Sequence, residues 1–512
     1  MISRIITLSK SVFLRFFLLG LALAFTQEPF NLPYCTFLVL PLVPFLVIRS
    51  LKTSKQYSLS GFAFGLGYFG LTFIWIINPF LVDPQKNIWL APFAYTLFVS
   101  LLSLFWALAF YISGYFMMDE QQNRKKVLCL SILFATAELF RCYLFSGFPW
   151  AILSYAWLDT PVSVFVTFLG PYIFNSIIII TGFNLFYSSL PIETFKVIFL
   201  ITALLGLQNK YSESYFGEIS EQLTIRLVQP NIKQKDKWKK ENESNHIEIL
   251  IDLSNKSPKP DLVIWPETSV YWLPEENPEK LKFIAEKVKS PLIFGALRFN
   301  RDTKKLFNAV FLINSEGNIK SIYDKTFLVP FGEYLPLGGL LKFFNIFNNS
   351  YRLIDGFSSG TGLEIIKNSG LPNFLPLICY EALFSNEILG KVKEAKWMLN
   401  ITNDAWFGNA GGPKQHLNIA RMRALENNIP LIRVSNNGIS AKISQNGMIE
   451  KFIPLNKKDF LDVQLGLQVK RESTYYANIG KNVLAYFHLM LLLLLLLYYS
   501  ISNNRKKGDQ SG

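Results

Sequence analysis

Cys379 is the residue of this chain that best fits nucleophilic catalysis. It ends the apolar run 374–379 and is followed by Tyr380, Glu381 and a stretch compatible with a helix. A nucleophile at a strand-to-helix turn is accessible, and the N–H groups of such a turn can bind an oxyanion. The alternative is a buried core cysteine, which is the commoner fate of a lone cysteine in a strand.

Three charged residues stand after strand-like runs or in apolar surroundings. Glu267 follows an apolar run, so its carboxylate is expected to be partly desolvated, as suits a general base. Lys325 follows another run and has Asp324 beside it as an ion-pair partner. Glu333 lies in the mostly apolar segment 329–336, where a solvated carboxylate is unusual. For Glu267 and Lys325, taken singly, a solvated surface charge is the alternative.

A serine-hydrolase pattern, G-x-S-x-G, occurs at Gly356–Gly360. That motif requires a strand before it and a helix after it. Here it follows the polar segment 348–352 and precedes the strand-like segment 363–366. We therefore predict a loop without a serine nucleophile.

The other cysteines and the histidines indicate no metal centre. Cys35, Cys129 and Cys142 lie in or beside hydrophobic segments, which is no disulfide framework. The three histidines are far apart in the sequence, so a His-rich metal site is not expected. No cofactor is predicted.

Alternating strand and helix patterns place these residues in an α/β domain over residues 211–480. The predicted strands are 224–229, 261–265, 291–295, 308–313, 374–379, 397–402 and 431–434. The predicted helices are 241–253, 278–288, 383–393 and 413–427. Such alternation is typical of sheets covered by helices.

The composition indicates a membrane protein, because half of the 512 residues are hydrophobic and only 17% are charged. A bilayer core of about 30 Å requires roughly 20 apolar residues per helix. We predict about eight spans, near residues 12–26, 32–49, 58–79, 89–117, 127–146, 162–187, 192–208 and 483–501. The predicted domains are a seven-span bundle over 1–210, the α/β domain over 211–480, and a last span with a basic tail over 481–512.

Basic residues in the short loops predict the orientation. With the N-terminus inside, the basic loops 49–55 and 124–126 are cytoplasmic, and seven spans place the α/β domain outside. A cleaved signal peptide is the alternative to the first span, and a re-entrant hairpin near 191–193 would place the α/β domain in the cytoplasm. The net charge of +14 fits an anionic membrane surface, and no nucleic-acid motif accompanies it.

The longer motifs resemble the apolipoprotein N-acyltransferase family, a membrane-embedded branch of the nitrilase superfamily. The matching segments are Gly147–Trp150, Val263–Thr268, Lys325–Pro336, Ile378–Glu381, Asn400–Gly408, Gly412–His416, Arg421–Glu426 and Asn436–Gly438. The resemblance covers nearly the whole chain, and it is specific because the full set occurs in this order.

The resemblance implies an extracytoplasmic nitrilase-like αββα sandwich beside the transmembrane bundle. It also implies a catalytic triad, with Glu267 as base, Lys325 as oxyanion partner and Cys379 as nucleophile.

Further residues are implied around this triad. The expected supporting residues are Glu333, Tyr380 and Glu381, and the expected substrate-binding residues are Trp238 and Trp406. Structural support of the site is expected from His416, Asn403 and Asp404.

The implied activity is transfer of a fatty acyl chain from a phospholipid, through a Cys379 thioester, to the α-amine of a lipoprotein's diacylglyceryl-cysteine. The implied partners are therefore a phospholipid donor, a diacylglyceryl-lipoprotein acceptor and the bacterial inner membrane, with the catalytic domain on its periplasmic side. The alternatives are a membrane-tethered amidase or hydrolase of the same superfamily, with water as acceptor, and a non-catalytic membrane scaffold.

Overall fold

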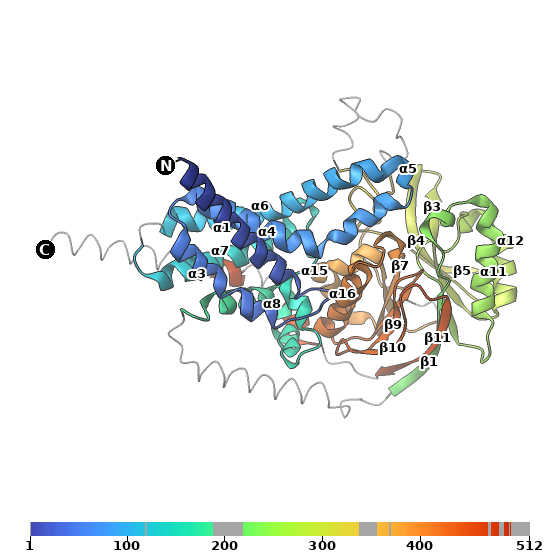
Figure 1. Ribbon diagram of the computed structural model, residues 1–512. Helices are drawn as coiled ribbons and strands as arrows, with labels where there is room; N and C mark the ends of the chain where they lie inside the picture. The colour runs from blue at the N-terminus through green and yellow to red at the C-terminus, as the bar shows by residue number, and fades with distance from the viewer. Residues whose placement is uncertain are drawn as a thin grey trace. The chain divides into compact units, whose positions relative to one another are not determined.

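A computed structural model describes residues 2–117, 120–187, 219–336, 356–367, 370–468, 473–480, 486–490 and 492 (Figure 1). The chain forms two compact units. The helical unit comprises Met1–Tyr211, Asn409–Gln415 and Tyr475–Gly512, and the α/β unit comprises Ser212–Gly408 and His416–Thr474.

The helical unit is built on long apolar helices. Its α-helices are α1 (Ile2–Ala24), α2 (Cys35–Val39), α3 (Leu42–Ser50), α4 (Ser54–Thr72), α5 (Pro84–Asn87), α6 (Ala91–Met117), α7 (Asn123–Tyr143), α8 (Phe165–Asn184) and α17 (Tyr475–Ile479). Helix α4 packs against both α1 and α6 (Figure 1). Where α4 meets α1, a Cβ added to Gly67 would lie 2.1 Å from the carbonyl oxygen of Phe17, so glycine permits the close crossing.

Two described helical segments are long and apolar enough to cross a membrane, Pro84–Met117 and Pro161–Asn184. The pair Ser54–Thr72 and Ile74–Leu81, bent by 50°, is a third if it forms one span. These segments match the predicted spans 89–117, 162–187 and 58–79.

The other predicted spans stand differently. Those at 12–26 and 32–49 coincide with the shorter apolar helices Ser11–Ala24 and Cys35–Ser50, and that at 127–146 coincides with α7. The span at 192–208, and that at 483–501 apart from residues 486–490 and 492, lie outside the described residues.

A buried ion pair lies within α7. Arg141 donates from Nε and one terminal nitrogen to both carboxylate oxygens of Glu138, at 2.9 and 2.8 Å. Its other terminal nitrogen donates to the carbonyls of Phe148 and Trp150, at 2.7 and 2.9 Å. The indole of Trp106 donates to Glu138 as well. Arg141 therefore fixes the backbone of the motif Gly147–Trp150.

The α/β unit contains two mixed sheets. The first has the order β11-β1-β2-β3-β4-β5 and the second β10-β9-β8-β7-β6. The strands are β1 (Ile219–Gln229), β2 (Leu262–Ile264), β3 (Leu292–Asn300), β4 (Lys305–Ile313), β5 (Ile319–Asp324), β6 (Phe374–Ile378), β7 (Trp397–Thr402), β8 (Leu431–Ser435), β9 (Ser440–Ile443), β10 (Ile449–Ile453) and β11 (Asp459–Gln468). Strands β1, β2 and β3 run parallel, as do β6, β7 and β8.

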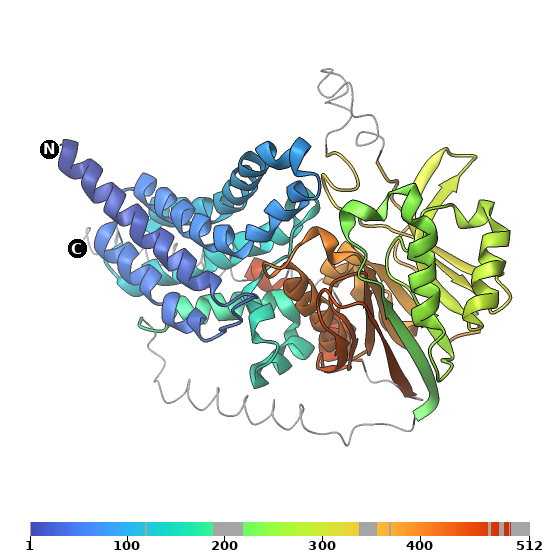
Figure 2. The same cartoon turned by 45° about the vertical axis from the view of Figure 1, so that its right-hand side comes forward.

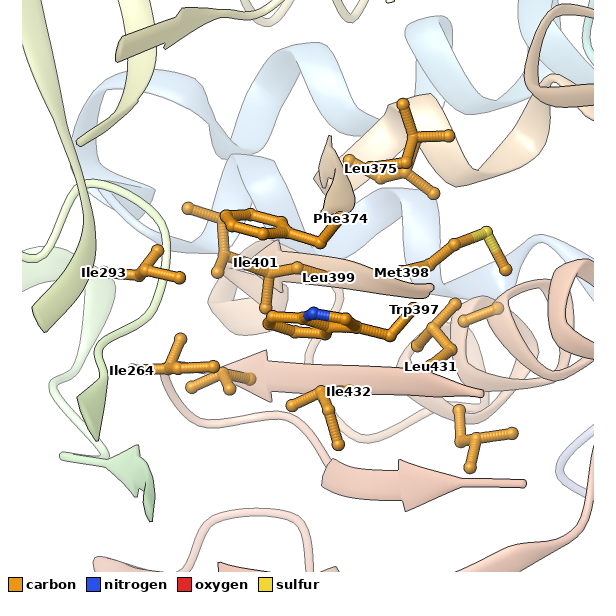
Figure 3. Close-up of a cluster of buried hydrophobic side chains, with 14 of the residues drawn as sticks. Ile264, Ile293, Phe374, Leu375, Trp397, Met398, Leu399, Ile401, Leu431 and Ile432 are labelled. Carbon is orange, nitrogen blue, oxygen red and sulfur yellow. The ribbon is translucent and has the colours of Figure 1, made fainter. Parts of the chain in front are cut away.

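The two sheets face one another, and helices cover their outer faces. One core joins side chains of both sheets, including Ile264 and Ile293 from the first and Leu399 and Ile401 from the second (Figure 3). Helices α11 (Glu243–Ser254) and α12 (Pro278–Val288), drawn in green, pack on the other face of the first sheet (Figure 2). Helices α15 (Ser385–Leu389) and α16 (Gly412–Asn427) contribute to the shared core from the second sheet's side (Figure 1).

Strands β2, β6, β7 and β8 are buried along their whole length, as expected of mostly apolar strands in sheets that are covered on both faces. The predicted single helix over 383–393 is wrong. A tight 3-10 turn covers Cys379–Leu383, α15 ends at Leu389, and Gly390 follows it. Glycine weakens a helix interior, which accounts for the early end.

Candidate active site

Cys379 starts the 3-10 turn that follows β6. Its φ is +50°, a left-handed conformation that is uncommon outside glycine and often marks a functional position. The residue is 8% exposed. Nε2 of His416 lies 3.1 Å from the Cys379 carbonyl oxygen, so the ring supports this strained backbone.

Glu267 lies three residues beyond β2, with 6% of its surface exposed. Its Oε1 accepts hydrogen bonds from Nδ2 of Asn308 at 2.7 Å and from Nζ of Lys325 at 3.3 Å. Its Oε2 accepts from the backbone N–H of Asn403 at 2.9 Å. The carboxylate is thus held in one orientation from three directions.

Lys325 follows β5 directly, and its side chain is fully buried. Besides Glu267, its Nζ contacts Oε1 of Glu333 at 2.8 Å. Oε2 of Glu333 accepts from the backbone N–H of Val329 at 2.8 Å, which anchors the loop of Glu333. One ammonium therefore bridges two carboxylates.

Burial and the nearby charges determine whether the Cys379 thiol is protonated at rest. Burial raises the pKa of the Cys379 thiol above its usual range, the charge of Glu267 raises it further, and Lys325 opposes both. Burial alone would lower the pKa of Lys325, but Glu333 and then Glu267 raise it above its usual range. The arrangement favours a neutral thiol beside a permanent ammonium.

Tyr380 and Glu381 follow Cys379 in the same 3-10 turn. Glu381 is fully buried and accepts from the backbone N–H of Ile378 at 2.7 Å, from that of Thr326 at 2.6 Å and from the hydroxyl of Tyr323 at 2.8 Å. It thereby ties the end of β6 to the segment beside Lys325. Tyr380 is 6% exposed.

A second buried polar cluster lies behind the nucleophile. Asp404 binds Nδ1 of His416 at 2.9 Å and Arg433 at 2.8 Å, and it accepts from the hydroxyl of Thr402 at 2.9 Å. Burial raises the pKa of Asp404, but Arg433 and then His416 hold it below its usual range. His416 thus contacts the Cys379 backbone, Asn403 contacts the Glu267 carboxylate, and Asp404 contacts His416.

Two residues at the site were missed from the sequence, Asn308 and Lys237. Asn308 donates to Glu267 and, at 3.1 Å, to Oε1 of Glu333. Its signal was a lone amide inside the apolar run 308–313. Lys237, the last residue of α10 (Gln234–Lys237), donates to the Glu267 carbonyl at 3.0 Å. No feature of the sequence separates it from the lysines around it.

Trp238 and Trp406 are 50% and 40% exposed. Trp238 follows Lys237, and its ring lies 5.7 Å from that of Tyr271. Trp406 lies three residues after Asn403, in the turn Asp404–Trp406. Trp238 therefore adjoins a residue that binds Glu267, Trp406 lies three residues from another, and both rings are at the surface. The serine pattern at Gly356–Gly360 lies in neither a helix nor a strand.

Strand β3 approaches the backbone of Glu267 closely at Gly295. A Cβ added there would lie 2.6 Å from Cα of Glu267 and 2.5 Å from the nitrogen of Thr268. Ser269 donates its N–H to the Gly295 carbonyl at 2.8 Å. Glycine is required because the strand and the turn share this space.

Two family models match this chain. Residues 224–474 match the carbon-nitrogen hydrolases, and residues 19–183 match the apolipoprotein N-acyltransferase N-terminal domain. The chain is 31% identical over 480 residues to the apolipoprotein N-acyltransferase of Brucella suis biovar 1 (strain 1330), covering 88% of each chain. It is 32% identical over 495 residues to that of Rhodopseudomonas palustris (strain ATCC BAA-98 / CGA009), covering 91% of each. Among solved structures, Nit3 of Saccharomyces cerevisiae is 18% identical, with a TM-score of 0.38 over 48% of this chain and 91% of Nit3.

Proposed function

The chain belongs to the apolipoprotein N-acyltransferase family, and we propose that it acylates lipoproteins through a thioester on Cys379. As a member it is an enzyme that transfers acyl groups to lipoproteins. The proposal concerns the roles of its residues, the acyl donor and the orientation in the membrane.

In the first half-reaction the acyl donor is a phospholipid. Glu267 takes the proton of the Cys379 thiol as the sulfur attacks the ester carbonyl carbon. The Lys325 ammonium stabilises the oxyanion that forms. The carbon–oxygen bond then breaks, Glu267 returns its proton to the leaving alkoxide, and the products are a lysophospholipid and an acyl-thioester on Cys379.

In the second half-reaction the acceptor is the α-amine of a diacylglyceryl-cysteine at a lipoprotein N-terminus. The amine nitrogen attacks the thioester carbon and gives a proton to Glu267. The carbon–sulfur bond breaks, and Glu267 protonates the sulfur to restore the thiol. Splitting one difficult transfer into two steps is the purpose of a covalent intermediate.

One observation carries this proposal: a fully buried Lys325 ammonium bridges Glu267 and Glu333, and its charge acts on Cys379. Because burial keeps the thiol protonated at rest, the proton moves to Glu267 only as an ester arrives. This suits an enzyme whose nucleophile must survive between substrates without reacting.

The membrane arrangement is part of the proposal. We place a seven-span bundle over residues 1–210, the catalytic domain over 211–480 on the periplasmic side of the inner membrane, and the eighth span in 481–512. The basic loops 49–55 and 124–126 support a cytoplasmic location for those loops. A lipid donor and a lipid-anchored acceptor both fit a site served from the outer leaflet.

Mass spectrometry of the intact protein tests the thioester. Purified full-length protein incubated with phospholipid vesicles should gain one acyl chain on Cys379, and C379A should gain none. Addition of a diacylated lipopeptide should discharge the adduct with formation of the N-acylated peptide. An unmodified wild-type protein would refute the proposal, and release of the chain as free fatty acid would favour a hydrolase.

A further inference from the structure

Lys237 is a buried cation beside the site that the mechanism above does not use. Its side chain is 2% exposed, whereas the neighbouring Lys233, Lys235, Lys239 and Lys240 are exposed. Its Nζ donates to the Glu267 carbonyl oxygen at 3.0 Å and to Oγ1 of Thr268 at 2.8 Å. Among the described residues, no carboxylate forms an ion pair with it.

The turn that Lys237 binds is strained. Thr268 has a φ of +44°, which is unfavourable for a β-branched residue. Lys237 binds this turn through its two hydrogen bonds, and Gly295 of β3 approaches the same two residues closely. Glu267, which carries the base, is the first residue of that turn.

Lys237 also offsets negative charge at the site. With both carboxylates ionised, Glu267 and Glu333 against Lys325 leave one negative charge, which opposes a negative charge on sulfur or on an oxyanion. Lys237 brings the total charge of these four side chains to zero. Burying an ammonium against neutral acceptors costs folding free energy, so stability does not explain the residue.

We propose that Lys237 is a positioning residue for the acylation step: its ammonium holds the turn of Glu267 and offsets the second carboxylate of the site. The inference rests on the proposed thioester mechanism and adds a second cation to it.

The proposal predicts a pH dependence. Burial lowers the pKa of Lys237 to about 8, although Glu267 and Cys379 raise it. The titratable groups around its ammonium are Glu267, Cys379 and His246 of α11, with Asp236 beside it in α10. The pKa values of Lys325 and Cys379 lie above this range and that of His246 is lowered. Burial raises the pKa of Glu381, whose charge acts with that of Lys325, to about 7, so the loss of the decline in a Lys237 variant is what assigns the decline to Lys237. Acylation should therefore slow as the pH rises through about 8 and Lys237 loses its charge.

The test measures single-turnover formation of acyl-Cys379 in the whole protein over a range of phospholipid concentrations up to saturation, as a function of pH. K237M should be slower by about 10²-fold with an unchanged KM, because one preorganised charge is lost. Its rate should lack the decline near pH 8, and its melting temperature should not fall. K235M, which removes an exposed charge two residues away, should behave as wild type.

A second variant separates the charge from the hydrogen bond. T268V removes one acceptor but keeps the ammonium, so it should retain the decline near pH 8 and lose less than about 10-fold in rate. The inference is overturned if K237M acylates as fast as K235M. It is also overturned if K237M is slow but keeps the pH decline and melts lower, because that pattern is purely structural. A wild-type protein that forms no adduct would instead refute the proposed function.

Discussion

The two units of this protein each bury a cation against carboxylates, and they do so differently. In the helical unit, Arg141 forms a bidentate salt bridge with Glu138, and its other terminal nitrogen donates to the carbonyls of Phe148 and Trp150. In the α/β unit, Lys325 is shared between Glu267 at 3.3 Å and Glu333 at 2.8 Å, beside a neutral thiol. Both cations are fully buried.

The difference distinguishes a structural ion pair from the one to which we assign a catalytic role. In the Arg141 pair, one guanidinium balances one carboxylate, and the remaining donors of Arg141 bind backbone carbonyls. The Lys325 cluster has two carboxylates for one ammonium, and its charge acts on the Cys379 thiol, which loses its proton in the proposed mechanism. Burial alone therefore does not identify a functional charge; the balance of charges and partners does.

The largest expected effect comes from E267Q. The amide keeps the shape of Glu267 but cannot take the thiol proton, so acyl-enzyme formation should fall by about 10³-fold. Lys325 keeps Glu333 as its partner, so the melting temperature should change little. Rapid-quench mass spectrometry measures the rate, and E248Q, on the exposed side of α11, should match wild type. A normal rate in E267Q would remove Glu267 from the chemistry.

In the helical unit we expect a variant that loses stability but keeps its activity. E138Q leaves the buried Arg141 without a carboxylate, which should cost about 3 kcal/mol of stability. Acylation per folded molecule should stay within about 3-fold of wild type, since the hydrogen bonds of Glu138 go to Arg141 and Trp106 and the proposed mechanism does not use it. Thermal unfolding in detergent, compared with the exposed-site control R124Q, measures the loss. If E138Q were stable but slow, the distinction between a structural Arg141 pair and a catalytic Lys325 cluster would be wrong.

A smaller effect is expected from N308A, which sharpens the comparison within the Lys325 cluster. Asn308 donates to both Glu267 and Glu333, so its loss should loosen both carboxylates and slow acylation by about 10-fold. The exposed Asn318 in the turn after β4 supplies the control N318A. Equal rates in the two variants would mean that Lys325 alone orders the carboxylates.

Much of the α/β fold follows from the sequence because several of its strands are buried on both faces. β2 and β6 are continuous apolar runs, and β7 and β8 are mostly apolar but include the buried Asn400 and Arg433. All four were predicted to within one residue at each end. The edge strand β10 was not predicted, because its residues are mostly exposed and include Glu450 and Lys451. Strand β11, at the edge of the first sheet, was missed as well.

Some residues of the candidate site could likewise be predicted from the sequence, and others could not. Glu267, Lys325 and Cys379 were predicted because each follows a strand and stands in a long motif. Asn308 and Lys237 were missed because their importance arises from contacts between distant segments. The bond from Lys237 to the Glu267 carbonyl spans 30 residues, and local patterns carry no information on such a pairing.

The absence of a side chain at Gly295 bears on which sequence changes this enzyme tolerates. Alanine is ordinarily among the mildest replacements, yet a methyl group here would occupy the space of the Glu267 backbone. Such a substitution would leave Glu267, Lys325 and Cys379 in the sequence but would shift the backbone of Glu267. An inactive allele of this gene therefore need not alter any reactive group, and position 295 should be as intolerant of variation as the nucleophile.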